Sequence, residues 1–311
     1  TSIQLAERGL PVDWHATLHI ALEAAELAKF PVSAGLFLPD GYPAQPEQYL
    51  PLGKLTETLK ALSNNGPDTF YRGLLAERIA SDLQAGGSRI AADDLASYEV
   101  LHLEPLVGVH RGAKVYTPSE TSGGLRLNEA LGYIEAHLDL DQPIGAHTYT
   151  TYANALNHAF HNHERRLGRG CTSHMSAVDA EGNMVALTYT LLNRFGSKVM
   201  LPSTGILMNN SVSYFDPRPG YPTTMEGHKR INASNMCPTL CVRNNQALFA
   251  VGASGANHIV PCTLQITAFL LDYGVSLEEA FNLPRIDAGG RQSIRVDPAL
   301  GDDVITVLAQ E

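Results

Sequence analysis

The sequence predicts an α+β fold in which helical layers surround antiparallel strands. In the first half, apolar residues recur at helical spacing. After Gly170, alternating segments joined by tight turns are typical of strands. Near residue 250, a strand-like run leads through a glycine turn into an apolar helix. Strands flanked by helices indicate a layered domain, and this pattern predicts that the second half carries the sheets.

Three helices are predicted in the first half. The first two carry their apolar residues three or four positions apart, at Trp14, Leu18, Leu22 and Ala25 and at Leu75, Ile79 and Leu83. The glycine pair at 86–87 ends the second helix. The third runs from about Thr148 to Arg166. Two proline-rich segments, 38–51 and 203–222, predict irregular loops.

The second half predicts strands joined by tight turns within 174–191, within 235–253 and at 293–297. Residues 246–274 predict a strand, a glycine turn and a buried helix. A short helix follows, with Ser276 as its N-cap and Glu279 at the capping-box position.

Composition limits the possible partners. The 311 residues carry a net charge of −10, and only 17% are charged. No basic stripe is visible, which argues against nucleic acid. No apolar run approaches the ~18–20 residues of a membrane span. The chain starts at Thr1 without a charged and apolar leader, and we expect a cytoplasmic or periplasmic protein, with the cytoplasm slightly favoured.

The four cysteines, Cys171, Cys237, Cys241 and Cys262, show neither a CxxC pair nor zinc-finger spacing. Cys237 and Cys241 lie on one face of a predicted strand. Burial as small apolar side chains is the preferred interpretation, and a disulfide or a metal pair is the alternative.

The stretch GCTSHMSAVDAEGN, residues 170–183, opens a predicted hairpin with Cys171, Thr172, Ser173 and His174. Cleavage before Thr172 would free an α-amine beside the Oγ1 of the same residue. Because an α-amine has a pKa of ~7.7–8.0, it can act as a base at neutral pH. From these residues alone, an ordinary strand threonine remains the preferred interpretation.

Several separated motifs change that preference. Nine motifs occur in a family-specific order. Those before residue 170 are LPDGYP, FYRGLLAERIA, DLASYEV and YTPSETSGGLRLNEALGYIE. Those after it are TSHMSAVDAEGNMVALTYTLLNRFGS, LPSTGILMNN, HKRINASNMCPT, VGASGANHI and FNLPRIDA. The chain resembles the γ-glutamyltranspeptidase family over nearly its whole length.

This resemblance implies an N-terminal-nucleophile hydrolase with a four-layer αββα sandwich. The precursor would cleave itself between Cys171 and Thr172. Residues 1–171 would form the large-subunit-like part and residues 172–311 the small-subunit-like catalytic part, together one structural domain. The two fragments would stay associated, and a homodimer is possible.

The resemblance also assigns roles to individual residues. Thr172 is the nucleophile, and Thr190 supports it by hydrogen bonding. Gly255 and Ala256 match the residues whose backbone N–H groups form the oxyanion hole. Ser234 and Asn235 match a serine pair that holds the substrate carboxylate. No metal or organic cofactor is implied.

Three departures from the family pattern concern the substrate. Tyr214 stands where the family has an aspartate that binds the α-ammonium of the substrate. Leu192 replaces a carboxylate-binding asparagine, and Asn193 beside it could take over that role. The family's carboxylate-binding arginine belongs to an early segment that this sequence lacks. The junction at 167–170 is also shorter than in the family, and we expect that residues are missing there.

These departures point toward the branch that includes the cephalosporin acylases, which cleave amides of dicarboxylic acyl groups. We expect hydrolysis of γ-glutamyl or related dicarboxylic-acyl amides, small molecules or peptides, in preference to transfer. The competing hypothesis is a catalytically inactive scaffold or binding protein.

Other patterns have weaker functional interpretations. His158, His161, His163 and Glu164 could bind a metal, but a solvated helix end is the preferred interpretation. Residues 119–124 resemble a phosphate loop only loosely, and a loop near the active site is preferred. Cys171 or Ser173 could replace Thr172 as nucleophile, against the family register. His174 is interpreted as a structural strand residue rather than a triad base.

Overall fold

The structure, a computed structural model, describes residues 1–119, 122–162, 171–215, 234–289 and 293–310. The chain divides into two compact units. The first comprises Thr1–His102 and Leu191–Ser211, and the second comprises Leu103–Thr190 and Val212–Glu311. Each unit therefore contains residues from both sides of position 172.

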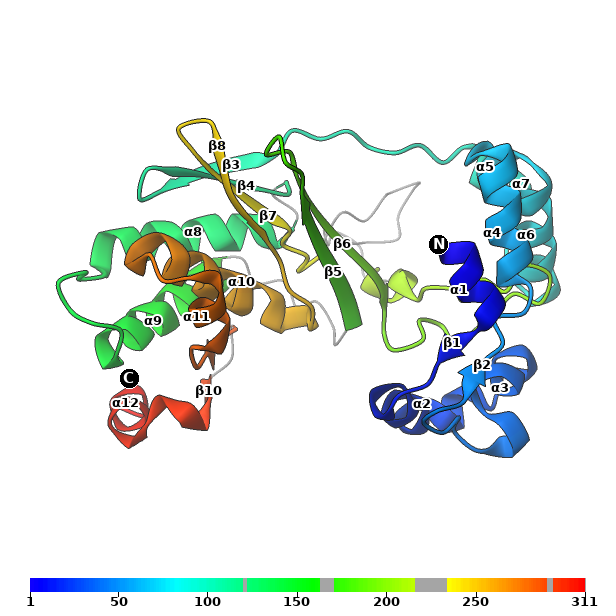
Figure 1. Ribbon diagram of the computed structural model, residues 1–311, viewed down its shortest axis with the longest axis horizontal. Helices are drawn as coiled ribbons and strands as arrows, with labels where there is room; N and C mark the ends of the chain where they lie inside the picture. The colour runs from blue at the N-terminus through cyan, green and yellow to red at the C-terminus, as the bar shows by residue number, and fades with distance from the viewer. Residues whose placement is uncertain (120–121, 163–170, 216–233, 290–292, 311) are drawn as a thin grey trace. The chain divides into compact units, whose positions relative to one another are not determined.

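The first unit is mainly helical (Figure 1). Its elements are α1 (Ser2–Arg8), β1 (Leu10–Pro11), α2 (Trp14–Leu27), α3 (Pro31–Phe37), the 3₁₀ turn η1 (Pro39–Gly41), β2 (Tyr49–Leu50), α4 (Leu55–Asn65), α5 (Asp68–Arg72), α6 (Leu74–Ala85) and α7 (Ala92–Ala96). β1 and β2 pair antiparallel. The predicted helix around Leu75 is confirmed as α6, and Gly86 is its C-cap.

Helix α2 occurs where the spacing predicts it, but its buried face is different. Asp13 caps the helix by accepting a hydrogen bond from the Ala16 N–H. Ile20 and Leu27 are buried, whereas Trp14 is 70% exposed and Leu18 and Leu22 are exposed too. The apolar spacing therefore located the helix and not the side that packs into the core.

The segment Leu191–Ser211 comes from the second half of the chain and completes this unit. Phe195 packs against Phe37 with ring centroids 4.8 Å apart. The hydroxyl of Thr58 donates a buried hydrogen bond of 2.7 Å to the carbonyl of Thr204. Residues far apart in the sequence thus share one core.

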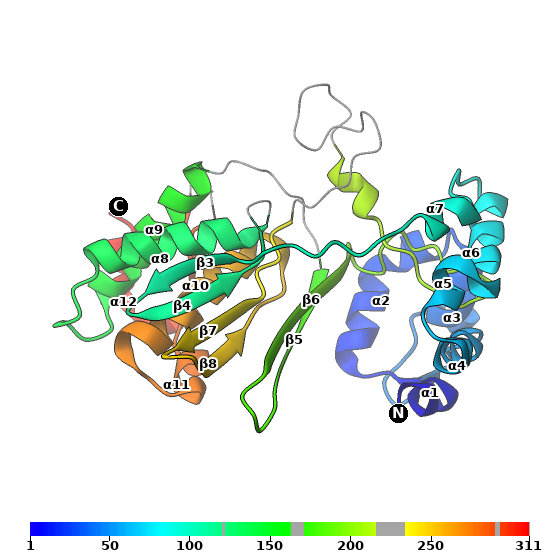
Figure 2. The ribbon, with the colours of Figure 1, turned by 90° about the horizontal axis from the view of Figure 1, so that it is seen from above.

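The second unit contains the larger sheet (Figure 2). Its elements are β3 (Leu106–His110), β4 (Ala113–Thr117), α8 (Gly123–His137), α9 (Ala146–Asn162), β5 (Cys171–Val178), most of β6 (Met184–Leu192), most of the 3₁₀ turn η2 (Ser211–Tyr214), β7 (Thr239–Arg243), β8 (Gln246–Val251), the 3₁₀ turn η3 (Ala256–His258), α10 (Ile259–Ala268), the π-helical turn η4 (Phe269–Tyr273), α11 (Leu277–Asn282), β9 (Ile286–Asp287), β10 (Arg295–Val296), the 3₁₀ turn η5 (Pro298–Leu300) and α12 (Asp302–Leu308).

The four-stranded antiparallel sheet has the order β3-β4-β7-β8. Half of it therefore comes from the first half of the chain, and the prediction that the second half carries the sheets was wrong in this respect. The missed signal is a pair of short alternating runs on either side of Arg111 and Gly112. These two residues both have positive φ and form a tight turn.

Helices cover one face of this sheet. Cys241, Phe249 and Val251 belong to the core formed with α8, α9 and α10, which lie on one side of the sheet (Figure 1). β5 and β6 form a separate two-stranded sheet, and β5 contacts β8, the edge strand of the larger sheet. The chain thus combines helices with antiparallel sheets, and the predicted α+β sandwich is confirmed.

Several local predictions are also confirmed. Ser276 and Glu279 form the predicted capping box at the start of α11. Cys237 and Cys241 are free thiols inside the core, although Cys237 precedes β7. Burial raises the pKa of each thiol to about 12, so both remain protonated at neutral pH.

The glycine-rich stretch before α8 is a helix start. The Ser122 hydroxyl caps α8 by accepting from the Gly124 N–H, and the carbonyl of Met236 accepts from the Gly123 N–H. A Cβ on Gly123 would lie 2.6 Å from the carbonyl oxygen of Asn235. Only glycine allows residues 235–237 to pass this close to the helix.

Candidate active site

The predicted nucleophile lies near the start of a β-hairpin. Thr172 is the second residue of β5, and Thr190 lies on β6. Two contacts indicate the register of the antiparallel pair β5–β6. The Asp179 N–H donates to the Asn183 carbonyl in the turn, and the side chains of His174 and Thr188 are in contact. That register brings Thr172 opposite Thr190, and side chains in such a pair have Cβ atoms about 4.5–5.5 Å apart.

The same face of the hairpin packs against β8 and the loop that follows it. The imidazole Nδ1 of His174 lies 2.8 Å from Thr188 Oγ1, and its Nε2 lies 2.9 Å from Ser176 Oγ. A Cβ on Gly252 would overlap the His174 ring, so a glycine is needed there. Burial lowers the pKa of His174 below its ordinary value of 6.5. His174 therefore acts as a packing residue with local hydrogen bonds.

Residues 255–258 form a tight turn between β8 and α10. Gly255 has φ 110° and ψ 33°, and Ala256 has φ 55°. The His258 N–H donates to the Gly255 carbonyl and closes the turn. Backbone N–H groups in such turns and at helix N-termini can bind anions. Figures 1 and 2 both show the start of β5 near this end of α10.

A buried hydrogen-bond chain connects this turn to α8. The guanidinium of Arg126 donates from Nη1 to Asn235 Oδ1 over 2.7 Å, and Asn235 Nδ2 donates to Asn257 Oδ1 over 2.7 Å. Arg126 and Asn235 are only 3% and 4% exposed. The Arg126 guanidinium also lies 5.0 Å from the ring centroid of Phe160 on α9. The bond from the charged Arg126 contributes about 1.5–3 kcal/mol, and the bond between the two neutral amides about 0.5–1.5 kcal/mol.

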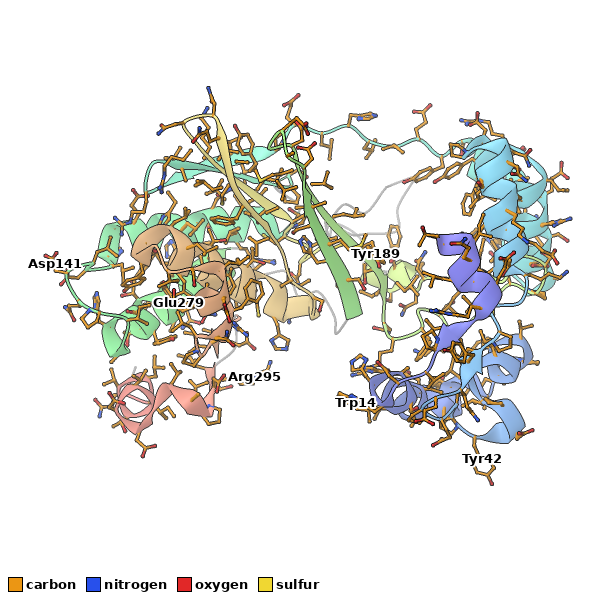
Figure 3. All side chains as sticks on the ribbon, in the orientation of Figure 1. Trp14, Tyr42, Asp141, Tyr189, Glu279 and Arg295 are labelled. Atoms are coloured by element: carbon orange, nitrogen blue, oxygen red, sulfur yellow. The ribbon has the colours of Figure 1, made fainter. Side chains whose placement is uncertain are left out.

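The other side of the turn is attached to the β9–β10 pair. His258 Nδ1 and Arg295 Nη2 each lie 2.8 Å from Asp287 Oδ2. Arg295, labelled in Figure 3, stands directly across the ladder from Asp287. The Gly289 N–H donates to the other oxygen of Asp287. The turn is therefore held through His258 as well as through Asn257.

The remaining predicted site residues belong to different units of the chain. Leu192 is 4% exposed, has φ 74° and ends β6. Asn193 belongs to the first unit, and its N–H donates to Asn210 Oδ1. Ser234 Oγ accepts from the Met236 N–H. The side chains of Tyr214 and Cys171 lie outside the described part of the structure, as do the junction residues 167–170.

Sequence reasoning missed the residues that support the turn. Arg126, Asn257 and Asp287 lie within the family motifs quoted above but received no role there, and Arg295 lies in none of those motifs. Their distance along the sequence left no signal that they meet.

The described residues contain neither a metal-ligand cluster nor a helix that could span a membrane. No group of three or more His, Cys, Asp or Glu side chains in that part of the chain is arranged to hold a metal. His158 contacts Asn162, whereas His163 and Glu164 of the predicted cluster lie outside the described residues. No helix in the described ranges has both the length and the apolar character needed to cross a membrane.

The chain is similar to known proteins of one family. The family model described as Gamma-glutamyltranspeptidase matches residues 1–169 and 164–311. The Glutathione hydrolase proenzyme of Escherichia coli (strain K12) is 29% identical over 333 residues, covering 89% of this chain and 57% of the relative. The Acylase ACY 1 proenzyme of Pseudomonas sp. (strain SE83) is 30% identical over 329 residues, covering 92% and 59%.

A similar fold occurs in the crystal structure of cephalosporin acylase from Bacillus halodurans. The TM-score is 0.87 at 21% identity, and the match covers 99% of this chain and 65% of that one. At this identity the likeness concerns the fold alone. The chain spans less than two thirds of the length of each of these three relatives.

Proposed function

The chain belongs to the γ-glutamyltranspeptidase family, and from that premise we propose that it is a self-processing N-terminal-threonine amidohydrolase. One observation carries the proposal. Thr172 and Thr190 face each other on a hairpin whose same face packs, through His174 and Gly252, against the segment that leads into the Gly255–Ala256 turn. A nucleophile, its hydrogen-bond partner and an anion-binding turn thus belong to one packed unit.

Processing begins with attack by Thr172 Oγ1 on the Cys171 carbonyl carbon. The C–N bond breaks, the acyl group moves from nitrogen to oxygen, and the hydroxyl proton passes to the departing nitrogen, which becomes the α-amine of Thr172. Water then hydrolyses the ester, which frees the Cys171 carboxylate and restores the Thr172 hydroxyl. The Glutathione hydrolase and Acylase ACY 1 relatives are both named proenzymes, which supports such a step.

In turnover, the α-amine of Thr172 takes the proton of its own Oγ1 as this oxygen attacks the substrate amide. The N–H groups of Gly255 and Ala256 stabilise the resulting oxyanion. The amine then protonates the leaving nitrogen, and an acyl ester remains on Thr172. Attack by water releases the acid and regenerates the hydroxyl. Thr190 donates or accepts a hydrogen bond that orients Oγ1.

For the substrate, we favour amides of dicarboxylic acyl groups that lack an α-amine. Tyr214 and Leu192 stand where the resemblance predicts an aspartate and an asparagine, so an ion pair with an α-ammonium has no carboxylate at position 214. The identities of 29% to a glutathione hydrolase and 30% to an acylase do not separate the two classes. The choice of substrate class therefore rests on the departures at positions 192 and 214.

Intact-mass spectrometry of the purified full-length protein tests processing. We expect two fragments whose junction lies directly before Thr172, and a single uncleaved chain for Thr172→Ala. Ser173→Ala is the matched control and should cleave normally, because its hydroxyl is not the nucleophile. An uncleaved wild-type chain after long incubation would favour the inactive scaffold.

Competition between two amides tests the substrate class. Glutaryl-p-nitroanilide and γ-glutamyl-p-nitroanilide differ only in the α-amine, so the ratio of their kcat/KM values reports recognition of that group. We expect the glutaryl amide to be preferred. Faster turnover of the γ-glutamyl amide, or of glutathione, would contradict the acylase-like assignment and leave the nucleophile assignment intact.

A further inference from the structure

Asn235 occupies an unusual position for a residue that the family resemblance assigns to substrate binding. It is 4% exposed, and both ends of its amide are used inside the protein. The side chain accepts from Arg126 and donates to Asn257, the residue that follows the predicted oxyanion residues. Its contacts thus lead from α8 to the turn.

Arg126 determines the polarity of this chain of hydrogen bonds. A guanidinium has donors only, so the oxygen of the Asn235 amide must face Arg126. The NH₂ group of Asn235 then faces Asn257, whose oxygen must accept. One arginine therefore selects the amide orientation of two asparagines in succession, and neither can flip without losing a bond.

The anchor at α8 is rigid. Arg126 is 3% exposed and lies over Phe160, while the backbone of residues 235–237 is held against the helix start through the Gly123 N–H and the Met236 carbonyl. Asn257 is the residue between Ala256 and His258 in η3. A restraint on the Asn257 side chain therefore also restrains the backbone of the turn, which includes the N–H groups of Gly255 and Ala256.

We propose that Arg126, Asn235 and Asn257 form a positioning relay that holds the oxyanion turn in its anion-binding conformation. The proposal rests on the proposed function and assigns Asn235 to the turn in place of the substrate carboxylate. None of the three is a catalytic residue, because they act through the backbone of Gly255 and Ala256.

The test measures kcat and KM separately on two amides, one with a dicarboxylic and one with a neutral acyl group. Asn257→Ala removes the acceptor at the turn, and Asn235→Ala removes both bonds. We expect each to lower kcat about 10- to 100-fold on both amides, with KM little changed, because a displaced donor set weakens transition-state binding alone.

Non-additivity is the second expected result. The double variant Asn235→Ala/Asn257→Ala should be no slower than Asn235→Ala, because both substitutions remove the same link. Arg126→Lys, which retains a cationic donor, should lose less activity than Arg126→Met. Asn128→Ala is the matched control: Asn128 is also an amide on α8, but it donates to Thr117 and should keep the wild-type kcat.

Thermal unfolding of Asn257→Ala and Asn128→Ala separates positioning from general stability. A fall in kcat with similar melting temperatures supports the relay. The relay is overturned if Asn257→Ala keeps the wild-type kcat, if the two asparagine effects multiply, or if Asn235→Ala raises KM only for the dicarboxylic amide.

If Asn235→Ala fails to fold, the kcat values of Asn257→Ala and Arg126→Lys decide whether the relay exists. Wild-type protein inactive on both amides would overturn the proposed function, and the relay with it.

Discussion

At the scale of single residues, Gly255 and Ala256 impose the strictest demands in the candidate site. Gly255 has φ 110°, which L side chains rarely adopt, and a Cβ there would contact His258 at an ordinary 3.5 Å. The requirement for glycine therefore comes from the backbone and not from crowding. Ala256, with φ 55°, adopts a left-handed backbone conformation that costs a residue with a side chain about 1–2 kcal/mol and that glycine adopts freely.

We predict opposite effects for two substitutions in this turn. Gly255→Ala should destabilise the folded protein by more than 1 kcal/mol and lower kcat, because φ must change or remain strained. Ala256→Gly should retain activity and unfold at an equal or slightly higher denaturant concentration, since relief of strain is partly offset by a more flexible unfolded chain. Urea titrations and initial rates of both variants measure this difference. Equal effects would contradict the backbone account.

At the scale of elements, the hairpin β5–β6 presents two different faces. Thr172, His174 and Thr190, which lie on one face, are half-buried. Along β6 the alternate residues Val185, Leu187 and Tyr189 are exposed, and Figure 3 labels Tyr189 among them. The attachment of the hairpin to β8 thus depends on the inner face, where the His174 ring fills the space that Gly252 leaves open.

This packing predicts a pH dependence of stability. Burial lowers the pKa of His174 in the folded state, so below about pH 6.5 the unfolded chain binds this proton more readily. The contribution of His174 to stability should be complete above pH 6.5 and decline as the pH falls toward the folded-state pKa. His174→Asn removes the titrating group, so its free energy of unfolding should fall less between pH 7.5 and 5.0 than that of the wild type. Parallel urea curves at these pH values would contradict the assignment.

At the scale of the whole molecule, segments from the two sides of position 172 share both cores. In one unit β4 pairs with β7, and in the other Phe37 packs against Phe195. Cleavage before Thr172 breaks one peptide bond and leaves the sheet register and these apolar contacts in place.

We therefore predict that the two processed fragments remain together without a covalent link. They should co-elute in size-exclusion chromatography under native conditions, with or without reductant, because Cys237, Cys241 and Cys262 are free thiols. Separation should require denaturant. Release of either fragment in native buffer would show that the shared cores are too weak to hold them.

The sequence by itself determined the elements whose signals are local. The capping box of α11, the glycine end of α6, the β5–β6 hairpin and the motif around Thr172 all depend on residues a few positions apart, where backbone geometry and side-chain reach act directly. The order of family motifs added the proposed role of Thr172.

Only the tertiary structure decided which distant residues meet. It paired β4 with β7, turned Trp14 to solvent, and joined Arg126 on α8 to Asn257 through Asn235. A buried arginine and a surface arginine on a helix look alike in sequence. They differ in whether the rest of the chain supplies acceptors that offset the loss of water, and this depends on packing between segments more than a hundred residues apart.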